Sequence, residues 1–376
     1  FYNPESYDCL SFANEWDDGA MGTECGYFVP IFENLEGFID DDGNSKIEEA
    51  KEFEQANRNK KKGTNDPKAY DQYIAEHPVC PAEATLQVSS NLFDISSLQE
   101  QYNKVKANKL HAIGTAGRLY YAKDNKIKFE PDGDARPILR FPHRKEDNLE
   151  GAIVLYEGPY RNQEGQTPHN LYLVCHDPYG QNQSADSSSL GAAYVIKRIN
   201  NISKPDDLIV ASYVGRPHTQ DEYNKNLFML ADYYNAKIGF ENDRGAVIQY
   251  AKQHRKLHKL QEEFEMLDKK ELRSRNVKRN YGMHTTEARK RQGELYIRDW
   301  LNAVRSEDEG STVLNLHKIY DLALLQELIK FNHKGNFDRV MALMVGMYHT
   351  RELYNAEVKE ILEDNASNDW FDRNYS

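Results

Sequence analysis

The segment Leu171–Gly180 reads LYLVCHDPYG, a short apolar run that ends in an acid and then in Pro178 and Gly180. Its side chains alternate in the manner of a buried strand, and proline cannot donate a hydrogen bond to a continuing ladder. The strand is therefore expected to stop at Asp177, which places a carboxylate at a strand end. An acid before a Pro-x-Gly turn also serves as a plain turn or capping residue, so Asp177 gains a functional role only if other acids join it.

Two later acids occupy comparable positions. The segment AKIGFENDRG predicts a short strand over residues 237–240 that ends at Glu241, and Gly335-Asn336-Phe337 opens a last helix with Asp338 in its first turn. Hard divalent cations prefer oxygen ligands, and two ions about 3.5–4 Å apart need carboxylates that converge from different elements. Glu241 also suits a turn, and Asp338 also suits a helix N-terminus. Taken together, the three placements favour a site for two Mg²⁺ or Mn²⁺ ions.

The elements around these acids predict a mixed α/β arrangement. Strands are expected within residues 118–131 as a hairpin, and over 151–156, 192–199 and 208–214; helices are expected over 219–235, 246–254 and 320–331. Strands with short connections suggest an antiparallel meander, and the later alternation of helix and strand adds further layers. The expected fold class is therefore a mixed sheet flanked by helices, preceded by a mainly helical region with helices near residues 45–58, 66–76 and 94–107.

The acidic stretch IDDDGNSKIEEA at residues 39–50 has the first three ligand spacings of an EF-hand loop. Such a loop also needs glycine at its sixth position and glutamate at its twelfth, where this chain has Ser45 and Lys51. Ser45 followed by Glu48 instead fits a capping box. We therefore expect a helix start here and no calcium site.

Charge is distributed unevenly along the 376 residues. Residues 1–60 hold 15 Asp or Glu and 4 Lys or Arg, a net charge of −11, whereas the whole chain has a net charge of −12. The remaining residues therefore have a net charge of −1 and can bind a polyanion locally. Their densest basic cluster is predicted to bind DNA, with a solvated helical face as the alternative. The cluster consists of Arg273, Arg275, Lys278, Arg279, Arg289 and Arg291.

The four cysteines show no CxxC pair and no metal-ligand spacing, so we expect reduced thiols, with Cys175 buried in a strand. No apolar run approaches the roughly 20 residues that a membrane span needs, and no signal-like segment opens the chain. These features favour a soluble intracellular setting. Because the chain begins with Phe1, it is expected to be a fragment or a cleaved product.

Three segments, YLVCHDPYG, IGFENDRG and NFDRVMALMVG, resemble the three acidic motifs of the large terminase subunit of tailed bacteriophages, in the order of its C-terminal nuclease part. The resemblance implies a ribonuclease H-like α/β fold and assigns Asp177, Glu241 and Asp338 as catalytic acids that bind two Mg²⁺ or Mn²⁺ ions. It also implies a metal-dependent endonuclease that cuts concatemeric viral DNA in the host cell cytoplasm. The segments HPVCPAEAT and GAIVLYEGPY are similar to stretches between that family's ATPase core and its nuclease strand.

The resemblance implies four partners: double-stranded DNA, the packaging ATPase domain of the same protein, the small terminase subunit and the portal. It implies no association with a membrane. The packaging ATPase has a phosphate-binding loop, but this chain contains no Gly-Lys dipeptide, so we expect no ATPase activity from it. The expected division is a linker or ATPase tail at residues 1–110, connecting β segments at 111–160 and the nuclease domain at 161–376.

Two other functions remain open. Transposases and integrases share the ribonuclease H-like fold, but they usually place two Asp before a final Glu, whereas the order here is Asp, Glu, Asp. A DNA-binding or docking module without chemistry would use the same acids structurally. Metal-dependent nicking of plasmid DNA discriminates between an enzyme and such a module. His176, beside the first acid, either touches a metal or packs in the core.

Overall fold

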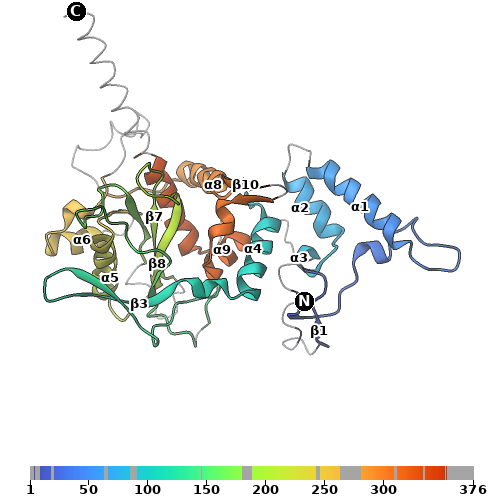
Figure 1. Ribbon diagram of the computed structural model, residues 1–376, viewed down its shortest axis with the longest axis horizontal. Helices are drawn as coiled ribbons and strands as arrows, with labels where there is room; N and C mark the ends of the chain where they lie inside the picture. Colours follow the sequence, from blue (N-terminus) through green and yellow to red (C-terminus); the bar gives the residue numbers. More distant parts are fainter. Residues whose placement is uncertain are drawn as a thin grey trace, which may run out of the picture. The chain divides into compact units, whose positions relative to one another are not determined.

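The chain divides into two units in the computed structural model (Figure 1). One unit comprises residues 1–113 with 319–335, and the other comprises 114–318 with 336–376. The residues that the structure describes are 4, 9–17, 21–62, 67–84, 91–144, 146–179, 189–242, 246–262, 281–308, 311–332, 335–351 and 353. Among them, no helix combines the length and the apolar character needed to cross a membrane.

The first unit is mainly helical, as expected. Its elements are β1 (Phe12–Ala13), β2 (Glu24–Cys25), η3 (Ile31–Glu33), α1 (Ile47–Lys62), α2 (Pro67–Glu76), α3 (Pro81–Ala84), α4 (Ile95–Ala107), η4 (Leu110–Ile113) and α9 (Leu322–Lys330). Helix α9 joins this unit because the region around α4 holds it: Asn91 Nδ2 donates to Leu328 O at 2.7 Å, and Gln101 Nε2 donates to Ile319 O at 3.0 Å. The predicted capping box is wrong, since the Ser45 hydroxyl donates to Glu33 O and the helix begins two residues later.

The second unit is built on a seven-stranded mixed sheet. Its strands are β3 (Thr115–Tyr121), β4 (Ile127–Pro131), β5 (Ala152–Leu155), β6 (Tyr172–Asp177), β7 (Gly191–Lys197), β8 (Leu208–Gly215) and β9 (Lys237–Phe240). They lie in the order β4-β3-β5-β8-β7-β6-β9, and every neighbouring pair is antiparallel except β6 and β9. Three meander strands followed by a helix and a parallel strand confirm the predicted fold class, a ribonuclease H-like mixed sheet flanked by helices.

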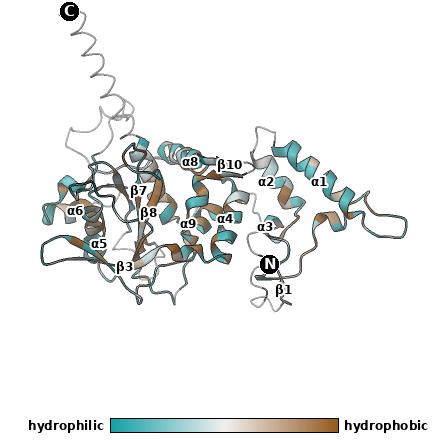
Figure 2. Cartoon of the chain, in the orientation of Figure 1, coloured by the Kyte–Doolittle hydropathy of each residue, from teal (hydrophilic) through white to brown (hydrophobic). Residues whose placement is uncertain are grey.

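Helices cover both faces of the central strands. Helix α5 (Gln220–Tyr233) packs Leu227 and Phe228 into the same core as Val174 of β6. On the opposite face, the helix of residues 338–351 lies so close to β6 that a Cβ added at Gly346 would be 2.7 Å from Cys175 Sγ. Figure 1 shows α5 on one side of these strands and this red helix on the other. Every residue of β6 and β7 is buried, and in Figure 2 strand β7 is largely brown.

The remaining elements of this unit are α6 (Ala246–Gln253), η5 (Leu257–Lys259), α8 (Glu287–Leu301), β10 (Val304–Asp308), β11 (Ser311–Leu314) and η6 (Asn315–Lys318). The β10–β11 hairpin was not predicted. The division into two units differs from the predicted ranges in two places. Strands β3, β4 and β5, within the predicted connecting range, extend the sheet that β6 belongs to. Residues 319–335 lie with residues 1–113.

Candidate active site

Strand register places Asp177 and Glu241 side by side. Asp177 is the last residue of β6, and Glu241 directly follows the last residue of β9. The two strands are parallel with His176 opposite Phe240, and the backbone N–H of Glu241 donates to His176 O at 3.2 Å. The next pair in this register is Asp177 and Glu241. Since side chains at paired positions point to the same face of a sheet, both carboxylates belong to one face.

That face is the one covered by the helix that carries Asp338. Side chains alternate along a strand, so Asp177 shares a face with Cys175, two residues earlier. Cys175 Sγ lies against Gly346 in the helix of residues 338–351, and Gly239, the register partner of Cys175, lies against His349 of the same helix. Asp338 is the first residue of this helix. Helix packing therefore brings the third acid to the face of the first two.

The hydrogen bonds of Asp338 fix it at the same end of the sheet. Its Oδ2 accepts from Leu190 N at 2.8 Å and from Asn336 Nδ2 at 3.2 Å, and its Oδ1 accepts from Ser189 Oγ at 3.1 Å. Leu190 comes directly before β7, in which Ala192 pairs with Asp177. Burial raises the pKa of the Asp338 carboxyl, while the hydrogen bonds from Leu190 and Ser189 lower it. The carboxylate is thus buried and anchored by backbone and side-chain donors.

Carboxylate oxygens suit Mg²⁺ and Mn²⁺, and three carboxylates at one end and one face of a sheet fit a hard divalent cation. The three hydrogen bonds to Asp338 occupy three of its roughly four lone-pair directions, which leaves Oδ1 able to accept once more. Within the described ranges, however, no group of three or more His, Cys, Asp or Glu side chains is close enough to hold a metal. The convergence of the acids follows from register and packing, and the two-metal site stays a prediction.

His176 packs in the core, away from this face. As the neighbour of Asp177 in a strand it points to the α5 side, where its ring lies 5.3 Å from the ring of Tyr223. Its Nδ1 is 3.0 Å from Ala192 O, and the residue is 1% exposed. Of the two roles considered for His176, metal contact and packing, the structure supports packing.

Burial lowers the pKa of His176 to about 4, below the value of about 6.5 for an unfolded histidine. The folded state therefore binds fewer protons between these two pH values, so the free energy of unfolding falls as the pH drops from about 6.5 to about 4. We expect His176→Gln to remove roughly 3 kcal/mol of this pH dependence. Denaturant unfolding at several pH values measures it, and His218→Gln, at an exposed position, is the matched control. An unchanged pH profile in His176→Gln contradicts the prediction.

An aromatic cluster that the sequence did not predict lies on the α5 side of the sheet, at the same end as the acids. The Tyr223 ring is 4.7 Å from that of Tyr213 and 5.5 Å from that of Tyr179. Burial raises the pKa of Tyr223 well above its ordinary value, and the negative charges of Asp177 and Asp338 raise it further, so both acids lie within electrostatic reach of one buried ring. Tyr179 follows Asp177 by two residues, and this closeness in sequence is a feature from which an aromatic side chain near the acids could have been predicted.

The predicted basic cluster is only partly described. Arg273, Arg275, Lys278 and Arg279 lie outside the described residues. Arg289 and Arg291 lie in the first turns of α8, where the Arg289 N–H donates to the capping Thr286 Oγ1 at 3.3 Å and Arg291 is exposed. DNA binding by this cluster stays a prediction. Each of the four cysteines lies outside any disulfide, and Cys175 is buried, as expected.

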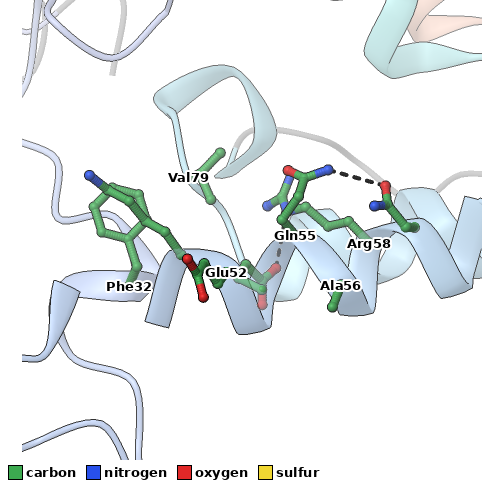
Figure 3. Close-up of a pocket in the computed structure, with 9 residues that line it drawn as sticks. Phe32, Glu52, Gln55, Ala56, Arg58 and Val79 are labelled. Carbon is green, nitrogen blue, oxygen red and sulfur yellow. Dashed lines mark hydrogen bonds and ion pairs between the residues drawn. The ribbon is translucent and has the colours of Figure 1, made fainter. Parts of the chain in front are cut away.

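The other unit contains a pocket of about 610 Å³ along α1 (Figure 3). Phe32, Glu52 and Val79 are among its lining residues, and none of the predicted acids is. The pocket's arginine, Arg58, is engaged with Glu54 at 3.0 Å and with Glu83 at 2.6 Å. These ion pairs give Arg58 a structural role between the helices of this unit.

No protein-family model and no curated protein sequence matches the chain. Among solved structures, the large terminase nuclease from thermophilic phage G20c is similar in its zinc-bound form, with 14% identity, 56% of this chain and 91% of that chain covered, and a TM-score of 0.32. Its magnesium-bound form gives 14% identity, 56% and 92% coverage, and a TM-score of 0.33. This likeness is weak, and the placement of the site depends on the register and packing described above.

Proposed function

We propose that this chain is the nuclease of a phage DNA-packaging terminase, a metal-dependent endonuclease in which Asp177, Glu241 and Asp338 hold two Mg²⁺ or Mn²⁺ ions. The proposal is supported by the register and packing that assign two strand-end acids and one helix-start acid to one end and one face of a buried sheet. Its substrate is concatemeric double-stranded viral DNA in the host cell cytoplasm. The packaging ATPase domain, the small terminase subunit and the portal are proposed partners.

The chain's own residues supply ligands and rigidity. Asp177 and Glu241 end adjacent parallel strands, so backbone hydrogen bonds fix their spacing. Asp338 is held by Leu190 and Ser189, and it is 7% exposed. Two bound divalent cations would activate a water for attack on the phosphodiester and stabilise the departing 3′ oxygen. Such positioning is most effective in a site with little water, because charges interact more strongly there.

A DNA-docking module without chemistry is the second candidate. It is favoured by the three hydrogen bonds that the Asp338 carboxylate already accepts, because an acid engaged in this way can be purely structural. The two candidates differ in whether added metal leads to strand cleavage.

The test is nicking of supercoiled plasmid by the whole chain. With Mn²⁺ or Mg²⁺ we expect conversion to open circles, and with a chelator we expect none, because the acids by themselves provide no nucleophile. Adding excess Mn²⁺ to the chelated sample should restore nicking. DNA binding without cleavage in any divalent metal would overturn the endonuclease proposal in favour of the docking module.

A further inference from the structure

The loop that joins β4 to β5 is fastened beside Asp338 at two points. Arg339, the next residue in the chain, donates from Nη2 to Ile138 O at 2.9 Å. Phe337, the preceding residue, packs its ring 5.3 Å from that of Phe141. Because both chain neighbours of Asp338 hold this loop, residues 138–141 lie at the rim of the candidate active site.

The same loop is braced internally by one acid. Asp147 Oδ1 pairs with Arg140 Nη2 at 3.1 Å, and its Oδ2 accepts from the backbone N–H of Arg144 at 2.7 Å. The negative charge of Asp147 is therefore used to shape the loop. The Arg144 side chain is exposed and forms no ion pair with any residue in the described part of the chain. A guanidinium group is thus presented on a loop of defined shape.

Arg216 approaches the site from the sheet. It follows the last residue of β8, Gly215, which pairs with Gly191 at the start of β7. Its Nη1 donates to Ser189 O at 3.0 Å, and Ser189 also donates to Asp338. Its guanidinium lies 5.3 Å from the centre of the Tyr179 ring. Arg216 is therefore linked to the Asp338 carboxylate through a single residue, Ser189.

His143, in the same loop, is near enough to these groups for their charges to affect its pKa. Burial lowers its pKa, as do the positive charges of Arg339 and Arg216, while the negative charges of Asp147 and Asp338 raise it. A half-buried imidazole that is affected by both Asp338 and Arg216 lies at the same rim as the two arginines.

We infer that Arg140, Arg144 and Arg216, here called the cationic rim, bind the phosphodiester backbone of DNA beside Asp177 and Asp338. This inference rests on the proposed function. Clustered carboxylates repel DNA, so a substrate phosphate needs fixed positive charge nearby, and guanidinium groups match phosphate oxygens in a two-pronged geometry. Because phosphates are the same in every sequence, the rim confers affinity without sequence preference. Arg140 is paired with Asp147, so the exposed Arg144 provides most of the contact.

The test is binding of a short DNA duplex by the whole chain in chelator, where the proposed cleavage does not occur, from about 50 to 200 mM salt. Each lost phosphate contact should make the plot of log affinity against log salt less steep by about 0.9. Between about 50 and 200 mM salt, the affinity of such a variant should therefore fall by a factor about 3.5 times smaller than that of the parent. We expect this change in Arg144→Ala and in Arg216→Gln. The matched control is Arg161→Ala, an exposed arginine in the turn before β6, at the end of that strand opposite to Asp177. It should keep the parental slope.

Nicking with Mn²⁺ is measured on the same variants. Arg144→Ala should nick more slowly at low DNA concentration and recover at saturating DNA, since a contact made equally before and during reaction affects KM alone. If Arg144→Ala and Arg161→Ala have equal slopes, the cationic rim does not bind DNA, whatever the nicking result. If only the triple variant Arg275→Ala, Lys278→Ala, Arg279→Ala changes the slope, the DNA lies on the basic cluster instead. If the rim variants change the slope but the parent never nicks, the rim stands and the endonuclease proposal falls.

Discussion

Replacing Asp177 by Asn, Glu241 by Gln or Asp338 by Asn is expected to reduce Mn²⁺-dependent plasmid nicking by about a thousandfold, equivalent to roughly 4 kcal/mol of transition-state stabilisation. Each substitution keeps the size of the side chain and removes one negative charge. Without that charge the ligand set binds a divalent cation more weakly, and the attacking and departing oxygens lose their stabilisation. The measurement is the initial rate of open-circle formation at saturating Mn²⁺.

Melting curves accompany these rates. Clustered like charges repel one another in the absence of metal, so Asp177→Asn is expected to raise the melting temperature of the metal-free protein. Asp221→Asn is the matched control, because Asp221 is an exposed acid in the first turn of α5, as Asp338 is a first-turn acid of its helix. It should nick at the parental rate. Near-parental nicking by any folded site variant would remove that residue from the site, and unfolding of all three would favour a structural role.

Gly346→Leu is expected to lower the melting temperature by about 6–12 °C, the equivalent of roughly 3 kcal/mol in a domain of this size. A Cβ at this position would be 2.7 Å from Cys175 Sγ and 2.8 Å from Ile196 Cδ1, and both of these residues are fully buried. The helix must then move away from β6 and β7. Since Asp338 begins the same helix, a displacement of about 1 Å should also reduce nicking by about a hundredfold.

Gly133→Leu is the control for this substitution, because no atom lies within 4 Å of a Cβ added at Gly133. It should keep the parental melting temperature and nicking rate. A Gly346→Leu protein that melts and nicks like the parent would contradict the close packing of this helix on the sheet.

Local sequence patterns determined most of the elements of the second unit. The apolar run that ends before Pro178 predicts β6 and its last residue, and the run before Glu241 predicts β9, because strand formation and termination depend on the residues themselves. The positions of the three acids at two strand ends and a helix start therefore follow from the sequence alone. The opposite directions of Asp177 and His176 also follow from the two-residue period of a strand.

Tertiary structure decided how these positions lie relative to one another. The parallel pairing of β6 with β9 sets Asp177 beside Glu241, and the packing of Gly346 on Cys175 selects the face on which Asp338 lies. The loop carrying Arg144 reaches the site only because Arg339 and Phe337 hold it there. The sequence did not predict that α9 packs with the first unit or that β3 to β5 extend the sheet of β6. An apolar face shows that a segment is buried, but it does not show which partner buries it. The sequence by itself determined the helices and strands and where they end, because these depend on residues that are neighbours along the chain. The pairing of strands, the face of the sheet that each helix covers and the cationic rim depend on contacts between residues that are far apart in the sequence.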